Sequence, residues 1–233
     1  MAIATEPGGS DTRLAQLRLM QLISPSLPVG SFTYSQGLEW AVEAGWVKDA
    51  DDLQAWLGHL LREALAATDL ALLVRLYDAA LAGDDKALND WAQLTLACRE
   101  SAELRLEEAN RGRALVGVLE KLDLPVSAGL RPVLAACQCA GFAYACAHWE
   151  ISKPAMLTGY AWSWLENTCL AGVKIIPLGQ SDGQRILAAL AAEVDEAINT
   201  ALSLPDDDIG AGSTALAIAS SRHHYQYTRL FRS

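Results

Sequence analysis

The chain has 233 residues, of which 52% are hydrophobic but only 7% aromatic, and its formal net charge is −10. The apolar share is therefore mostly alanine and leucine, which favour helices, and the length allows a sizeable core. An acidic surface repels phosphate, so nucleic acid and anionic membrane are poor partners. The five cysteines are an odd number, which favours reduced thiols in a cytoplasmic protein over a disulfide framework.

The N-terminal region begins without a secretory pattern. Residues 1–12 have neither a basic n-region nor an apolar core, and we interpret them as a flexible lead. Asp11 is a candidate cap for a first helix, which ends at Pro25. A second helix is expected over 33–44, with Gly45 just after its end.

The middle of the chain carries a succession of helical patterns. Apolar residues at helical spacing predict helices over about 51–65, 68–83, 84–122 with a break near 100–101, 128–149, 153–172 and 182–202. Ser181, with Gln184 three residues later, resembles a capping box for the last of these. No stretch alternates with period two, so no significant sheet is expected. The predicted fold class is all-α, a single-domain bundle of roughly eight to ten helices within residues 13–204.

The tail, residues 205–233, has a different composition. Pro205 and nearby aspartates and glycines are typical of loops, and a short helix is expected over 214–221. Residues 222–233 are basic and aromatic in an otherwise acidic chain. Asp206–Asp208 could bind a hard cation, but solvated turn caps are the favoured interpretation.

A search for catalytic motifs finds none. The sequence has no Gly-rich phosphate loop after a strand, no H-E-x-x-H, no C-x-x-C and no nucleophile elbow. Cys137 and Cys139 lie two apart on a predicted helix and point in different directions, which favours a buried core over a metal site. His223 and His224 are adjacent, and neighbours rarely chelate one ion together, so they are weak metal candidates.

An acidic stretch with interspersed arginines covers residues 99–113. Its glutamates are Glu100, Glu103, Glu107 and Glu108. The favoured interpretation is a solvated helix face with i,i+4 ion pairs. The alternative is a face complementary to a charged partner.

Four segments have an unusual, ordered combination of residues: LPVGSFTYSQGLEW at 27–40, ACRESAELRLEEANR at 97–111, GYAWSWLENTCLAGVKIIPLGQ at 159–180 and SRHHYQYTRLFRS at 221–233. Gln36 and Glu39 are three apart, so a helix over 33–44 would place them on one face. Lys174 lies at a predicted helix C-terminus, where a lysine needs no functional explanation. In order and spacing these segments resemble the UreF family of urease accessory proteins, over nearly everything from Leu14 to Ser233.

The resemblance implies an all-α homodimer that binds UreD (also called UreH) and the GTPase UreG. That complex delivers nickel to apo-urease, and the UreF-like chain is neither the GTPase nor an enzyme and needs no cofactor. The positions matching the GTPase side of the family pattern are Ser35, Gln36, Glu39, Gly172, Lys174 and Gln180. Those matching the UreD-binding tail are Arg222, Tyr227, Arg229 and Phe231.

A rival hypothesis comes from a different functional class. It is a helical metallochaperone or metal-dependent enzyme that uses His223, His224 and Asp206–Asp208. This hypothesis requires tight nickel or zinc binding by the isolated chain, whereas a scaffold requires protein partners.

Overall fold

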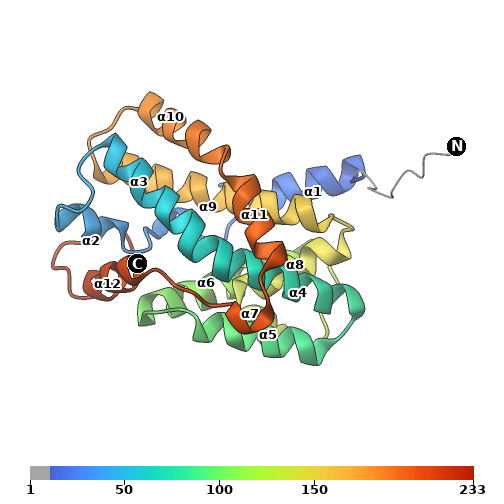
Figure 1. The fold of residues 1–233 in the computed structure, drawn as a ribbon. Helices are drawn as coiled ribbons and strands as arrows, with labels where there is room; N and C mark the ends of the chain where they lie inside the picture. The colour runs from blue at the N-terminus through green and yellow to red at the C-terminus, as the bar shows by residue number, and fades with distance from the viewer. Residues whose placement is uncertain (1–10) are drawn as a thin grey trace, which may run out of the picture.

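The computed structural model describes residues 11–233, and all of the regular structure in that range is helical (Figure 1). The α-helices are α1 (Arg13–Ile23), α2 (Leu38–Glu43), α3 (Ala50–Leu60), α4 (Ala71–Ala82), α5 (Asp85–Ala97), α6 (Ala102–Lys121), α7 (Arg131–Ala136), α8 (Gln138–His148), α9 (Lys153–Ile175), α10 (Gln180–Ala191), α11 (Val194–Ser203) and α12 (Thr214–His223). Two 3-10 turns, η1 (Ser31–Thr33) and η3 (Asp206–Asp208), and a π-helix, η2 (Leu61–Leu70), complete it. The all-α prediction is confirmed, but the predicted eight to ten helices are too few.

The core is built around α8 and α9. Every residue from Gln138 to Ala147 is buried, and α8 packs against α4, α5, α6, α7 and α9. Its alanines and glycine allow this close packing, since a Cβ on Gly141 would lie 3.2 Å from the side chain of Leu115. In Figure 1, α9 runs through the middle of the molecule with α1 beside its N-terminal half. Within residues 11–233, none of the helices combines the length and the hydropathy that a membrane crossing requires.

The cap of the first helix differs from the prediction. Thr12, not Asp11, caps α1, because its hydroxyl accepts a hydrogen bond from the Ala15 amide at 3.1 Å. The Asp11 carboxylate instead accepts hydrogen bonds from the amide and the hydroxyl of Ser152, at 2.7 and 3.1 Å. It therefore ties the start of α1 to the start of α9. Residues 1–10 of the predicted lead lie outside the described part of the chain.

The second predicted helix begins later than expected. Gln36 and Gly37 have φ angles of +53° and +78°, which an α-helix does not permit, so α2 starts at Leu38 instead of Thr33. Gly37 is required here, because a Cβ would lie 2.6 Å from the backbone nitrogen of Ser220 in α12. Consequently Gln36 and Glu39 do not share a helix face, and that prediction is wrong. Gly45, with φ +74°, does follow the helix end as predicted.

Three predicted boundaries also change. There is no helix start at Thr68, because α3, η2 and α4 run on without interruption. The Thr68 hydroxyl instead donates to the Ala211 carbonyl at 3.3 Å and so holds the loop before α12. The predicted helix over 128–149 is interrupted at Cys137, which has an extended conformation. The predicted helix over 182–202 is two, α10 and α11.

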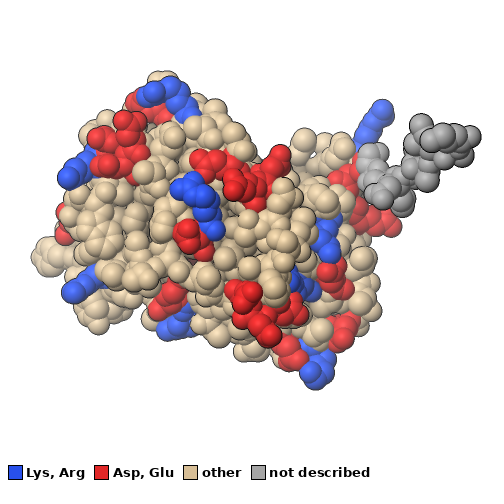
Figure 2. Space-filling model, viewed as in Figure 1, with Lys and Arg blue, Asp and Glu red and all other residues tan. Residues whose placement is uncertain are grey.

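The α10 cap shifts by two residues. Gly179 is the N-cap and makes only half of a capping box, since glycine has no side chain, while the Asp182 carboxylate accepts from the Gly179 amide at 3.1 Å. Ser181 and Gln184 therefore do not have the predicted role. The break near residue 100 is confirmed, since Ser101 caps α6 through the Leu104 amide at 3.1 Å. On the face shown in Figure 2, lysines and arginines are scattered among the acidic side chains and form no continuous basic surface.

Candidate functional site

The last residues of the tail lie on the body of the protein and bind it through their backbone. The amide of Arg232 donates to the Thr33 carbonyl at 2.8 Å. The amide and hydroxyl of Ser35 both donate to the Ser233 carbonyl, at 2.8 and 2.7 Å. Residues 229–233, called the docked segment below, are therefore anchored to the loop before α2.

Glu39 forms the centre of this anchorage. Its carboxylate is buried and accepts the backbone amides of Leu230 at 2.6 Å and Phe231 at 2.9 Å. The Phe231 ring is also buried and belongs to the hydrophobic core. Since two amides converge on one side chain 191 and 192 residues away, Glu39 fixes both the position and the direction of the docked segment.

His223 lies beneath the docked segment, between two carboxylates. Its Nδ1 is 2.7 Å from Glu103 and its Nε2 is 3.2 Å from Glu39. Glu103 also accepts from Arg229 at 2.8 Å. His224, in contrast, is exposed. Within residues 11–233, no group of three or more His, Cys, Asp or Glu side chains is placed to hold a metal ion.

The glutamates of α6 are not the solvated face that the sequence favoured. Glu103, Glu107 and Glu108 are all buried. Each has a defined partner: Glu103 binds Arg229, Glu107 accepts from the Ser233 hydroxyl at 2.8 Å, and Glu108 pairs with Arg99 at 2.8 Å. The predicted i,i+4 pair does occur between Glu107 and Arg111 at 3.0 Å. The chain's own tail supplies two of these partners, and the alternative of a face complementary to a charged partner protein stays a prediction.

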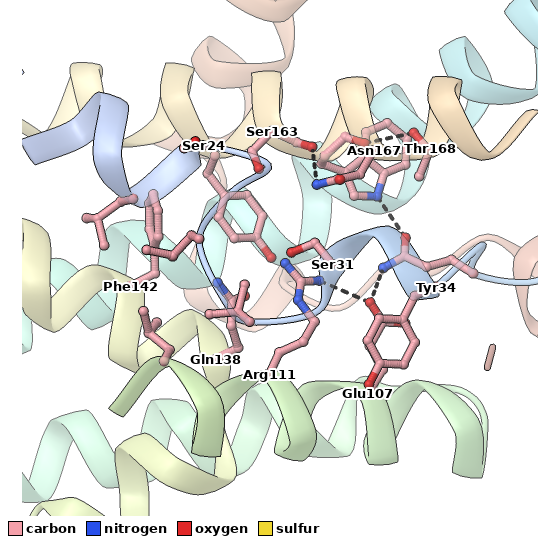
Figure 3. Close-up of a pocket in the computed structure, with 17 residues that line it drawn as sticks. Ser24, Ser31, Tyr34, Glu107, Arg111, Gln138, Phe142, Ser163, Asn167 and Thr168 are labelled. Atoms are coloured by element: carbon pink, nitrogen blue, oxygen red, sulfur yellow. Dashed lines mark hydrogen bonds and ion pairs between the residues drawn. The ribbon is translucent and has the colours of Figure 1, made fainter. Parts of the chain in front are cut away.

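A small polar cavity adjoins Glu107. Figure 3 shows Arg111 rising from α6 with Glu107 on one side and Gln138 on the other. Gln36 joins the loop to this site, since it donates to Glu107 at 3.1 Å and accepts from the Trp164 indole at 2.8 Å. The cavity volume of about 40 Å³ is room for roughly two or three waters. Arg111 Nε and Gln138 Oε1 have no protein partner within residues 11–233, so polar groups face this space.

A second cavity of about 40 Å³ lies on the other side of Glu107 and is lined by Asp69, Arg99 and Glu108. Burial by itself lowers the pKa of Arg99, but the carboxylates of Asp69 and Glu108 outweigh it and raise that pKa well above its ordinary value. Burial also raises the pKa of the Cys139 thiol, whose sulfur lies 3.2 Å from the Tyr160 hydroxyl. A protonated, buried thiol is a poor metal ligand, in agreement with the interpretation of Cys139 as a core residue.

The six residues expected on the GTPase side lie in two places. Ser35, Gln36 and Glu39 come together around the docked segment and the cavity, and Ser35 and Glu39 are buried. Gly172 is buried in α9, where a Cβ would lie 2.5 Å from the Leu53 side chain. Lys174 and Gln180 are exposed at the two ends of the loop between α9 and α10. Lys174 and Gln180 are therefore the exposed members of the six, and Gln36 is half-buried.

The four residues expected on the UreD side also divide by burial. Arg222 and Tyr227 are exposed, and Tyr227 has full solvent exposure. Arg229 is partly exposed above Glu103, whereas Phe231 is buried. Beside them Leu106 and Leu230 line a groove of about 640 Å³ and are themselves exposed. The exposed side chains of Leu106 and Leu230 in the groove, and of Tyr227 three residues before Leu230, are together called the tail surface below.

The sequence singles out Glu103, Glu107 and His223 without assigning them to hold the tail, and it does not single out Ser233. One signal could have identified two of them. Glu103 and Glu107 are spaced i,i+4 on a helix of an acidic chain whose basic residues gather in the tail, and opposite charges of this kind favour contact.

Comparisons with known proteins agree with this architecture. The UreF family model matches residues 47–191. A protein of Alcanivorax borkumensis named urease accessory protein UreF is 52% identical over 94% of this chain and 98% of its own length. Proteins of the same name from Alkalilimnicola ehrlichii and Klebsiella pneumoniae are 45% and 43% identical, over 100% and 94% of this chain and 100% and 97% of their own lengths.

Proposed function

The chain belongs to the UreF family of urease accessory proteins, and on that premise we propose that it is a non-catalytic scaffold for urease maturation. It bridges the GTPase UreG and UreD, acts as a homodimer in the cytoplasm, and couples GTP hydrolysis to nickel insertion into apo-urease. The relatives are named as accessory proteins, and no catalytic constellation is needed for such a role.

The observation that carries this proposal is the tail surface. Leu230 is exposed on the docked segment, whose backbone is fixed by buried contacts, and the exposed side chains of Leu106 and Tyr227 come from α6 and from the chain just before that segment. Aromatic and arginine side chains are the usual anchors of protein interfaces. A surface that is apolar, partly basic and held in place on an acidic protein is suited to a protein partner.

Two candidate ligands of the rival metal hypothesis already have other partners. His223 already contacts a carboxylate with each ring nitrogen, and Asp206 is paired with Arg75 at 2.8 Å. Both groups would have to give up these contacts to bind an ion.

Size-exclusion chromatography with light scattering tests the scaffold proposal directly. The chain is measured alone, with UreD, with UreG and with both. We expect a homodimer alone and a complex containing all three proteins in the mixture. Failure to form that complex, with all three components folded, would contradict the proposed function.

The tail surface is tested by Tyr227→Ala. Tyr227 is fully exposed and makes no recorded hydrogen bond in the described structure, so the fold is expected to keep its stability. Loss of an exposed aromatic anchor is expected to weaken UreD binding by about 1–3 kcal/mol, roughly a five- to 150-fold rise in Kd. Leu81→Ala is the control, because Leu81 is also an exposed apolar side chain but lies on α4, and this variant should leave UreD binding unchanged. Kd for UreD is measured by isothermal titration calorimetry. Equal Kd values for the two variants would show that Tyr227 is not part of the interface.

The GTPase side is tested by Lys174→Ala. Lys174 is exposed in the last turn of α9, and we expect the variant to fold normally but to recruit UreG about tenfold more weakly. Lys121→Ala is the matched control, because Lys121 is also an exposed lysine in a last helical turn, that of α6. Urease activation and UreG pull-down are measured together. Unchanged activation in the Lys174 variant would exclude it from the partner site.

A further inference from the structure

His223 is held in an unusual environment at the C-terminal end of α12. Its side chain has 0% solvent exposure, and both ring nitrogens face carboxylate oxygens. The charged groups around it are Glu39 from α2, Glu103 from α6, and Arg229 and His224 from the tail. Glu39 and Glu103 are the same two side chains that bind Arg229, Leu230 and Phe231 of the docked segment.

The chemistry of imidazole restricts how both contacts can be made. A neutral ring has one N–H and one lone pair, so only one of its nitrogens can donate. The other nitrogen would then place its lone pair against a carboxylate oxygen, at 2.7 Å for Glu103 or 3.2 Å for Glu39. An imidazolium donates from both nitrogens and makes two charge-assisted hydrogen bonds.

The charges of the cluster give the same answer. Glu39 and Glu103 supply two negative charges, while Arg229 supplies one positive charge. With an imidazolium at His223, the four groups Glu39, Glu103, Arg229 and His223 are neutral together, and His224, which is mostly exposed to solvent, stands outside this balance. With a neutral imidazole one buried negative charge has no counterion, and an uncompensated buried charge is strongly destabilising.

We propose that His223 is held as an imidazolium and is the positioning residue that docks segment 229–233 on the body of the protein. The docked segment stays in place while His223 is charged and is released when it becomes neutral. Protonation of His223 thereby determines whether the tail surface is held in place. This inference deepens the proposed function, but it concerns the isolated chain and can be tested without any partner.

The first test is the charge state of the ring in the wild-type protein. Histidine-selective ¹⁵N labelling and long-range ¹H–¹⁵N correlation distinguish an imidazolium, with two equivalent protonated nitrogens, from a neutral tautomer. The four histidines give four ring patterns, and His223→Gln identifies the one that belongs to His223. We expect an imidazolium pattern for His223 near neutral pH. A neutral tautomer pattern for His223 would overturn the proposal.

The second test asks whether charge, rather than shape, docks the segment. Amide hydrogen exchange of Leu230 and Phe231 is measured by NMR, with intrinsic rates corrected for pH. Raising the pH until the His223 ring is neutral should reduce protection of these amides by at least about tenfold. His223→Gln should reduce it similarly at neutral pH, because Gln keeps hydrogen-bonding atoms but not the charge.

The double variant His223→Gln/Glu103→Gln is compared with Glu103→Gln alone, because Glu103→Gln by itself removes the Arg229 contact of the docked segment. With one carboxylate already neutral, Arg229 offsets the remaining charge of Glu39, so adding His223→Gln should lower protection of Leu230 and Phe231 by less than about threefold. A loss as large as the one that His223→Gln causes in the wild type would show that His223 acts only by its shape and would overturn the proposal. If the single variant His223→Gln does not fold, the ring pattern of His223 in the wild-type protein still shows whether the ring is an imidazolium. Absence of UreD binding would leave all of these results unaffected.

Discussion

Replacing Arg99 with methionine is expected to destabilise the fold by about 3–5 kcal/mol, which is the range for breaking a buried ion pair. The Arg99 guanidinium lies 2.6 Å from Asp69 and 2.8 Å from Glu108, and all three side chains are largely buried. Methionine fills similar space but leaves two carboxylates close together in a poorly solvated region. Glu108 then keeps only its hydrogen bond from the Cys139 amide, at 2.9 Å, and its contact with the Cys137 thiol.

The pKa of Glu108 supports the direction of this effect. Burial alone would raise it, but the Arg99 charge and the Cys139 amide outweigh burial and lower it below its ordinary value. The carboxylate is thus ionised because of Arg99. The loss in free energy of unfolding is measured by urea denaturation monitored by circular dichroism.

Lys86→Met is the control for Arg99→Met. Lys86 is paired with Asp90 at 2.6 Å, but both side chains are mostly exposed, so solvent screens the pair and its loss should change the stability little. A loss of less than about 1 kcal/mol for Arg99→Met would place it with the surface pairs and refute a structural role for the buried network.

Replacing Gly37 with alanine is expected to cost about 2–4 kcal/mol and to loosen α12 from α2. Two effects add. The φ of +78° costs an L-residue roughly 1 kcal/mol or more, and the new Cβ would lie 2.6 Å from the Ser220 nitrogen and 2.9 Å from the Ala219 carbonyl carbon. Because these are backbone atoms of α12, no side-chain rotation can relieve the contact. Overpacking of this kind costs about 1–3 kcal/mol.

Gly83→Ala separates the two contributions. Gly83 also has a positive φ, +68°, but its Cβ would have no neighbour within 4 Å. We expect it to lose only about 1 kcal/mol. The difference between the variants in urea unfolding measures the contact with α12, and hydrogen exchange in α12 should increase only for Gly37→Ala. Equal losses would show that α12 moves away without cost.

Both variants act on parts of the protein that support the docked segment. Arg99 stabilises α6 at Glu108. The neighbouring Glu107 binds Ser233, and Glu103, just over one turn earlier, binds Arg229. Gly37 allows α12, which carries His223, to approach α2, which carries Glu39. The body of the protein therefore holds the tail through buried polar contacts, and the tail displays its aromatic and basic side chains outward.

The sequence by itself determined the helical class of the protein, its buried small-residue helix and the helix breaks at Pro25, Gly45 and Ser101. These depend on local propensity, on the periodicity of apolar residues and on caps, all of which act over a few residues. It also determined the family, because four segments have a specific order and spacing that the comparisons bear out.

Only the tertiary structure decided how the candidate site is assembled. Gly37, next to Gln36, packs against α12, and Glu103 and Glu107 are buried with partners that residues more than 100 positions away supply. The same holds for Glu39, which binds Leu230 and Phe231 instead of facing outward. Burial and pairing of a charge depend on contacts between distant parts of the chain, and no local pattern encodes those contacts.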